Sequence, residues 1–241
     1  MGKRWLIVGS VGLLITSGFG CNNKTNTKAG IIEADEVWSG KINIMGDVFL
    51  PEGVSLRITP KTEISFSPQV YRFDGVSLMK EQFPAELMAL VDNQKCDFII
   101  AGKILAVGKE AKQIRIGNDL WDGSIIFCGG NNQSIIKYCR IQGGFVGIRC
   151  LNSTQVEISK SKLTGNDWGI ICGRNSSPKI LNNIIEDNRI IGIAVGDFSF
   201  PAIYFNTISQ NPEGVIIQNQ ANPELRDNIF TNNGAEISDH R

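Results

Sequence analysis

Three segments of the sequence share one pattern of apolar and polar residues at a spacing of 22 or 23 residues: PKILNNIIEDN (178–188), PAIYFNTISQN (201–211) and PELRDNIFTNN (223–233). The same frame extends backward to residues 156–166 and 134–144, which makes five consecutive repeats. Self-similarity at a fixed period of this length indicates a solenoid, in which each repeat stacks on the one before it.

Four columns of the aligned repeats contain only apolar residues. The first two columns lie two residues apart, so they face the same side of a short strand, and each of the other two marks a further strand. β-Branched residues dominate, and the period leaves no room for a helix of useful length. The repeats therefore predict an all-β solenoid with three short strands in each coil of about 22 residues. The columns are Ile126/Ile148/Ile170/Ile193/Val215, Cys128/Cys150/Cys172/Val195/Ile217, Ile136/Ile158/Ile180/Ile203/Leu225 and Ile141/Leu163/Ile185/Ile208/Phe230.

Two further columns are polar and rich in asparagine. Asn and Gly tolerate the left-handed backbone that tight bends need, and stacked Asn amides can hydrogen-bond from coil to coil. We therefore interpret both columns as structural ladders rather than binding sites. They are Cys139/Ser161/Asn183/Asn206/Asn228 and Gly144/Asn166/Asn188/Asn211/Asn233.

The motif G-I-x-x-x-x-N-S-S-P-x-I-x-x-N-x-I-x-x-N, from Gly169 to Asn188, resembles the repeat of right-handed parallel β-helix proteins of the pectate-lyase-like superfamily. The resemblance is strongest over residues 123–235, and residues 46–66 resemble the first coil of such proteins in bacterial envelopes. It implies a β-helix domain over residues 38–241, with residues 67–96 as an insertion in which residues 84–91 favour a short helix. No capping helix is evident after the last coil, which leaves that coil open for self-association.

The N-terminus has the features of an export signal over residues 1–20. Lys3 and Arg4 precede an apolar stretch that is too short to span a bilayer comfortably, and small residues follow. The sequence GFGC (18–21) resembles the lipobox of bacterial lipoproteins, which implies a lipid on Cys21 and attachment to the membrane of the cell envelope. The same glycines suit ordinary cleavage before Cys21, which would release a secreted protein. Residues 21–37 would form a polar tether.

Composition excludes several functional classes. The chain has 24 Lys and Arg against 24 Asp and Glu, so it lacks the strongly basic surface that general nucleic-acid binding requires. Its one histidine, His240, stands next to the C-terminal residue, which argues against a Ser-His-Asp triad, a Cys-His dyad or a His-rich metal site.

Cys128, Cys150 and Cys172 are 22 residues apart, which predicts that they stack inward in one column. A linear stack cannot surround a metal tetrahedrally, so we expect buried thiols and no metal, with a disulfide between coils as the alternative. Apart from Cys21, five cysteines remain, so they cannot all pair within one chain.

Outward positions of neighbouring coils carry basic residues that predict a stripe for an acidic polysaccharide. Tyr204 would add a surface for stacking on sugar rings, as would Tyr138 or Phe205. The alternative is ordinary solvated charge, since Glu157 and Glu224 lie in the same region. The candidate basic ligand-binding residues are Lys137, Arg140, Lys160 and Lys162, with Lys179 nearby.

A second outward ladder is unexpectedly apolar: Phe127, Ile171, Ala194 and Ile216, broken by Arg149. We expect something to cover it, either the 67–96 insertion or a docked partner.

The resemblance also implies a catalytic alternative, because β-helix polysaccharide lyases pair Ca²⁺-binding carboxylates with an Arg or Lys base. We find no two acidic residues in register on adjacent coils, and fold alone does not confer activity. The sequence thus favours a non-catalytic binding or structural module of the envelope, contacting extended carbohydrate or a surface partner protein. The alternative is a small polysaccharide lyase or glycoside hydrolase, and only the lyase would need Ca²⁺ as a cofactor.

Overall fold

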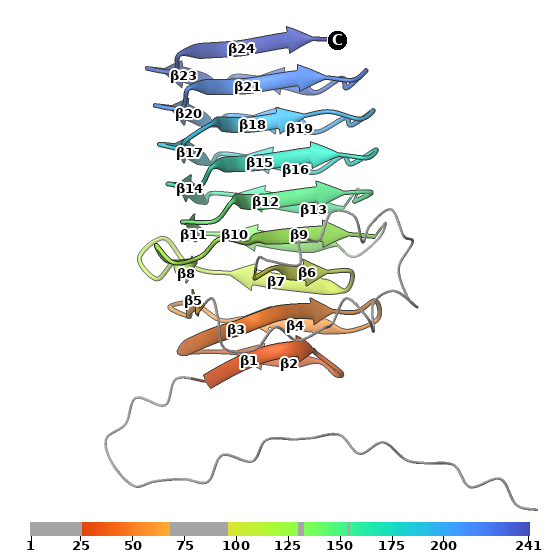
Figure 1. The fold of residues 1–241 in the computed structure, drawn as a ribbon, viewed down its shortest axis with the longest axis vertical. Coiled ribbons are helices and arrows are strands. Elements are labelled where there is room, and N and C mark those ends of the chain that lie inside the picture. Colours follow the sequence, from red (N-terminus) through yellow and green to blue (C-terminus); the bar gives the residue numbers. More distant parts are fainter. Residues whose placement is uncertain (1–25, 68–95, 130–132, 154) are drawn as a thin grey trace, which may run out of the picture.

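The computed structural model describes residues 26–67, 96–129, 133–153 and 155–241. They form a right-handed parallel β-helix of about eight coils stacked along one axis (Figure 1). The described residues contain strands and turns but no helix, as the repeats predict. The predicted export signal, Cys21 and the 67–96 insertion lie outside these residues, except for Ser67 and Cys96 at the insertion's ends.

Each coil passes through three faces, and every strand pairs in parallel with its equivalents on the adjacent coils. Face 1 contains β6 (Phe98–Ile100), β9 (Ser124–Cys128), β12 (Val146–Leu151), β15 (Trp168–Gly173), β18 (Ile191–Val195), β21 (Glu213–Gln218) and β24 (Ala235–His240). Face 2 contains β2 (Glu36–Trp38), β4 (Ser55–Ile58), β7 (Lys103–Val107), β10 (Ser134–Lys137), β13 (Val156–Ser159), β16 (Lys179–Leu181), β19 (Ala202–Tyr204) and β22 (Glu224–Arg226). Face 3 contains β5 (Glu63–Phe66), β8 (Ile114–Ile116), β11 (Cys139–Gln142), β14 (Lys162–Thr164), β17 (Ile184–Glu186), β20 (Thr207–Ser209) and β23 (Ile229–Thr231).

The first coils begin earlier than predicted. β1 (Asn26–Ile31) pairs along β3 (Lys41–Leu50), which itself runs from face 3 into face 1. Lys28 Nζ lies 2.6 Å from Glu36 Oε2, which ties β1 to β2. The predicted tether at residues 21–37 is therefore too long, because the solenoid already includes Asn26.

The core is a set of stacked inward columns. On face 1, Ile148, Ile170, Ile193 and Val215 pair in register and are fully buried. Burial of each such side chain contributes about 1.5–3 kcal/mol relative to leaving it exposed. A column of isoleucine and valine thus favours one register, because a slip of one residue would turn the column toward solvent.

Two of the predicted columns, those that begin with Ile126 and Cys128, are wrong at β9. Ser124 pairs with Val146 but Ile125 pairs with Ile148, so one extra residue is accommodated in β12 at this point. This irregularity turns Phe127 into the core against Cys150, whereas Ile126 and Cys128 lie on the outer side of face 1. The predicted outer ladder is corrected accordingly. Its members are Phe49, Ile99, Ile126, Arg149, Ile171, Ala194 and Ile216.

Left-handed residues turn the chain at each corner, and most of them are not glycine. After face 2 the column comprises Tyr138, Lys160, Asn182, Phe205 and Asp227, each with φ between 49° and 57°. Each of the first four donates its backbone N–H to a carbonyl of the next coil. These bonds offset part of the cost of the left-handed backbone.

Candidate functional site

Face 3 carries a row of charged side chains along the axis of the solenoid. Register pairing sets Arg115 on β8 beside Arg140 on β11, and Arg140 beside Lys162 on β14. Equivalent residues on adjacent coils are about 4.8 Å apart, so these three cations form a positive strip, which we name the basic row. Toward the N-terminal coils the row continues with Glu63 and then Lys41.

The ends of the basic row are paired with carboxylates and its centre is not. An Arg115 guanidinium nitrogen, Nη1, lies 2.9 Å from Glu63 Oε1, and Lys162 Nζ lies 2.5 Å from Glu186 Oε1. Arg140 Nε instead donates to the neutral Oε1 of Gln142 at 2.7 Å. Of these three cations, Arg140 is thus the one whose positive charge is not neutralised by an ion pair within the described ranges.

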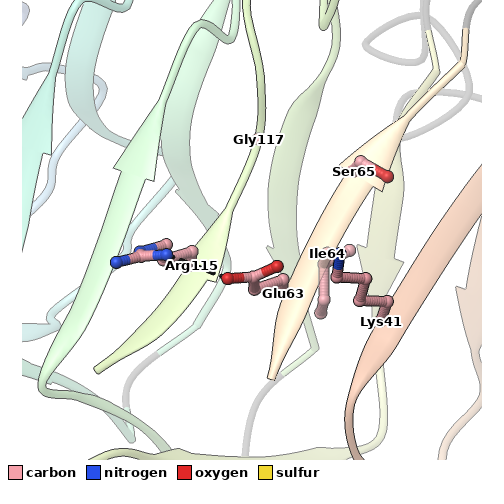
Figure 2. Close-up of a pocket in the computed structure, with 6 residues that line it drawn as sticks. All are labelled: Lys41, Glu63, Ile64, Ser65, Arg115 and Gly117. Atoms are coloured by element: carbon pink, nitrogen blue, oxygen red, sulfur yellow. Dashed lines mark hydrogen bonds and ion pairs between the residues drawn. The ribbon is translucent and has the colours of Figure 1, made fainter. Parts of the chain in front are cut away.

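A pocket of about 380 Å³ opens at the N-terminal end of the basic row. Figure 2 shows Glu63 reaching toward Arg115, with Lys41 on its other side. Two cations and one carboxylate leave this pocket with a net positive charge, which suits an anionic group. The lining residues are Lys41, Glu63, Ile64, Ser65, Arg115 and Gly117.

Backbone geometry fixes one wall of this pocket. Gly117 has φ = 100°, in the region that favours glycine, and a Cβ there would lie 2.0 Å from the carbonyl oxygen of Gln142. No other residue fits without moving β11. The wall therefore stays free of side chains, and the space beside Arg115 is held open.

A polar row runs beside the charged one, two residues further along the strands. It supplies hydroxyl and amide groups next to the cations, together with the carboxylate of Glu186. Its members are Asn43, Ser65, Gln142, Thr164, Glu186, Ser209 and Thr231.

The structure brings together only part of the predicted basic stripe. Arg140 and Lys162 are neighbours on face 3, but Lys137 lies on β10 in face 2. Lys160 occupies the corner between the two faces, and its Nζ lies 5.5 Å from the centroid of the Tyr138 ring. Lys179, on β16, pairs in register with the acidic Glu157.

Tyr204, the other predicted ligand-binding residue, lies on face 2. Its hydroxyl donates to Glu224 on the next coil, which also forms an ion pair with Arg226. Arg226 places its guanidinium carbon 5.4 Å from the centroid of the Tyr204 ring, and Phe205 packs edge-on at 6.5 Å. Tyr204 is thus part of a polar and aromatic surface that is separate from the basic row.

Sequence reasoning missed Lys41, Glu63 and Arg115. These residues precede the five aligned repeats, and Arg115 pairs with a residue 52 positions before it. The alternation of charged and apolar residues in Lys41–Ile44, Glu63–Phe66 and Ile114–Ile116 is the signal that could have placed them on one face.

The first asparagine ladder is built into the backbone of the corner. Asn206 is fully buried, and its Oδ1 accepts the backbone N–H of Asn183 at 2.9 Å and the Asn183 side-chain amide at 3.0 Å. Asn228 accepts from Asn206 in the same manner. These amides stabilise the bends and are not available to a ligand.

The cysteines on the described residues are free thiols: Cys96, Cys128, Cys139, Cys150 and Cys172. Cys150 and Cys172 stack in register inside the core, but Cys128 packs against Leu151 on the outer side of face 1, so its predicted place in the inward column is wrong. Burial raises the pKa of Cys128, Cys139 and Cys150 to about 12. Neutral buried thiols of this kind behave as small apolar residues.

Two acidic residues do align on adjacent coils, contrary to the expectation from the sequence. Asp47 and Asp97 hold equivalent positions just before the face 1 strands, and the backbone N–H of Asp97 donates to Asp47 Oδ1 at 2.9 Å. Asp97 Oδ1 accepts the backbone N–H of Ser124 at 2.7 Å. Both carboxylates thus bind the next coil, as the asparagine ladders do.

Two further features bear on the kind of site. Within the described ranges, no three His, Cys, Asp or Glu side chains are placed to hold a metal ion. The part of the chain that the structure describes has no helical stretch with the length and apolarity of a membrane span.

Comparison with known proteins identifies the architecture. No curated protein and no solved structure matched the chain. Residues 110–240, more than half of the chain, match the family described as the right handed beta helix region. The chain therefore belongs to the right-handed β-helix family.

Proposed function

We propose that the protein is a non-catalytic binding module that holds an extended acidic polysaccharide along the basic row of face 3. The observation that carries the proposal is the register of Arg115, Arg140 and Lys162 on three consecutive coils. A ladder of cations at a regular spacing suits a polymer with a carboxylate or sulfate on successive sugar units.

Arg140 is the expected centre of the interaction. Its guanidinium has no carboxylate partner among the described residues, so a ligand carboxylate need not displace an existing ion pair. A guanidinium can bind a carboxylate through two parallel hydrogen bonds, which fixes the ligand's orientation as well as its position. Gln142, which is partly exposed beside the row, would bind a sugar hydroxyl.

The pocket between Lys41 and Arg115 would hold one end of the polymer. Glu63 lies between these cations and would orient Arg115 while leaving the pocket with a net positive charge. A terminal acidic sugar would thus occupy the pocket, whereas internal sugars would lie along Arg140 and Lys162.

Binding is favoured over catalysis on this face because its carboxylates are engaged. Glu63 and Glu186 each form an ion pair with a member of the basic row, so neither carboxylate is free to contact a substrate without breaking that pair.

A lyase or glycoside hydrolase remains the second candidate, favoured by the alignment of Asp47 with Asp97. Burial raises the pKa of Asp47 to about 6, a value suited to proton transfer near neutral pH. The two carboxylates are too few for the Ca²⁺ of a lyase, which takes about six to eight oxygen ligands, and within the described ranges no third His, Cys, Asp or Glu side chain is placed with them to hold a metal ion.

We also propose that the protein is exported and that lipid on Cys21 holds it on the membrane of the cell envelope, with release as a secreted protein if Cys21 is only a cleavage site. The support is the sequence of residues 1–21. Metabolic labelling with an alkyne fatty acid separates the two routes. If Cys21 carries a lipid, the wild-type protein incorporates the label and Cys21→Ser does not. If Cys21 is only a cleavage site, neither protein is labelled.

One experiment separates binding from catalysis. The purified protein is incubated with polygalacturonate, alginate and a neutral glucan, with and without Ca²⁺, and polymer length and co-elution are followed by size-exclusion chromatography. We expect the acidic polymers to co-elute with the protein at unchanged length. Shortened chains would establish the enzyme instead, and absence of co-elution would redirect the search to a surface partner protein.

A further inference from the structure

One coil of the solenoid exposes three phenylalanines. In the turn between β18 and β19, Phe198 and Phe200 are 49% and 53% exposed, and after β19 Phe205 is 56% exposed. We propose that these rings form an aromatic platform across face 2 that binds the flat apolar face of uncharged sugar rings. The platform is a second binding surface, around the corner from the basic row, and it rests on the proposed function only in that both ligands are glycans.

Backbone conformation is the first argument that the platform is not incidental. Phe198 and Phe205 both have φ = 57°, in the left-handed region that is unfavourable for a bulky side chain. The equivalent residues of the adjacent coils are Asn175 and Gln220 for Phe198, and Asn182 and Asp227 for Phe205. Three of these four residues are asparagine or aspartate, which adopt this conformation more readily.

Exposure and strain at the same residues both oppose stability. The rings lie half in water, outside the core cluster, so burial does not compensate for the backbone cost. Phe198 and Phe205 each combine an unfavourable backbone conformation with an exposed apolar ring, and both lie in one coil. This combination points to a role other than folding.

Hydrogen bonds to the adjacent coils hold the backbone of the platform before any ligand binds. Phe198 donates its backbone N–H to Asn219 at 3.1 Å, and Phe205 donates to Arg226 at 3.0 Å. Phe200 donates to Ser176 on the previous coil at 2.9 Å. Binding therefore costs little loss of backbone freedom, which is the advantage of a preorganised site.

The groups beside the rings favour a sugar over a hydrocarbon surface. Tyr204 lies between Phe200 and Phe205, and it is linked to Glu224 and Arg226 by a hydrogen bond and ring stacking. A membrane or an apolar protein face would bury the Glu224–Arg226 ion pair and would offer no polar groups in place of the water around it. A sugar ring presents C–H groups to the aromatic faces and hydroxyls to the carboxylate and guanidinium at the rim.

The spacing suits more than one sugar unit. Phe200 and Phe205 lie just before and just after the short strand β19. The aromatic rings of Phe200 and Tyr204 are carried by residues four steps apart, which corresponds to roughly 13 Å of extended chain. We therefore expect an oligosaccharide to bind better than a monosaccharide, with its chain lying along β19 rather than along the solenoid axis.

The test uses three neutral probes, the β-1,4-linked hexasaccharides of glucose, mannose and N-acetylglucosamine, titrated into the protein by calorimetry. We expect at least one to bind, and we expect Phe198→Asn and Phe205→Asn each to weaken its binding fivefold or more. Both variants restore the residue type that suits the left-handed backbone, so their thermal midpoints should stay equal or rise. Ile229→Asn, at an exposed apolar residue on face 3, is the matched control and should bind normally.

Several results would overturn the platform: no binding of any of the three probes, unchanged binding in both phenylalanine variants, or equal weakening by Ile229→Asn. Sedimentation with phosphatidylethanolamine–phosphatidylglycerol vesicles that is lost in Phe198→Asn would replace the glycan with a lipid surface. The failure of the platform and the failure of the basic row give different results. Arg140→Gln should leave the binding of the neutral probes unchanged, so the two surfaces are tested independently.

Discussion

Asp47 and Asp97 occupy equivalent positions on adjacent coils, and the backbone N–H of Asp97 donates to Asp47 Oδ1 across 2.9 Å. Burial raises the pKa of Asp47 to about 6, and the negative charge of Asp122 adds to the rise, whereas the hydrogen bond from Asp97 acts in the opposite direction. The pair connects the second and third coils at the point where β3 passes into face 1.

This raised pKa predicts a pH dependence of stability. Because the folded protein holds the Asp47 proton more tightly than the unfolded chain does, the stabilisation is complete below pH 3.8 and is lost as the pH rises through about 6. Asp47→Asn keeps the acceptor oxygen and removes the charge. We expect this variant to be more stable than the wild type at pH 7.5, by up to about 3 kcal/mol, and equally stable at pH 3.5.

Urea unfolding at the two pH values, followed by circular dichroism, checks the prediction. Asp119→Asn, at an exposed carboxylate, is the control and should not gain stability at pH 7.5. An Asp47→Asn variant that is less stable than the wild type at pH 7.5 would show that the ionised carboxylate contributes to the native state.

The asparagine ladder predicts a steep cost for one side chain. Asn206 joins three coils, accepting from Asn183 and donating to Ile180 O and Asn228 Oδ1. Asn206→Ala leaves the buried N–H of Asn183 without its acceptor, so we expect a loss of about 3 kcal/mol or more in the free energy of unfolding. Asn228→Ala, in a partly exposed coil, should cost about half as much. Equal losses in the two variants would contradict a cooperative buried ladder.

The stacked cysteines predict chemical inertness. Cys150 and Cys172 lie in register in the core, and burial raises the pKa of both thiols. In a Cys21→Ser background, we expect Ellman's reagent at pH 8 to label no thiol in the native protein and all of them after unfolding. Cys172→Val should change stability by less than about 1 kcal/mol, because Val195 fills the same column on the next coil. Rapid labelling of the native protein would refute the buried placement.

The fold was predictable from the sequence because its repeats are nearly exact. Ile148, Ile170 and Ile193 recur at spacings of 22 and 23 residues, and a stacked isoleucine column permits one register only. The prediction failed at β9, where the pairing shifts between Val146 and Ile148. A one-residue irregularity reverses inside and outside, and nothing in the spacing of Cys128 and Cys150 marks it.

The candidate site was only partly predictable. Arg140 and Lys162 follow from the repeat because they are 22 residues apart. Glu63 and Arg115 are neighbours on face 3 but 52 residues apart in the chain, so no repeat length relates them. The exposed Phe198 and Phe200 fall in a turn whose length varies between coils, and the apolar pattern of the strands does not extend to it.

The measurement that tests the central claim most directly compares Arg140→Gln with Lys137→Gln. Both substitutions remove one positive charge, but Arg140 lies in the basic row of face 3 and Lys137 on face 2. Affinity for a defined oligogalacturonate is measured by calorimetry at two salt concentrations. The proposed function predicts that Arg140→Gln weakens binding at least tenfold, about 1.4 kcal/mol, while Lys137→Gln stays within twofold of the wild type. Equal weakening by the two variants would show that binding follows net charge rather than the basic row, and would contradict the proposal.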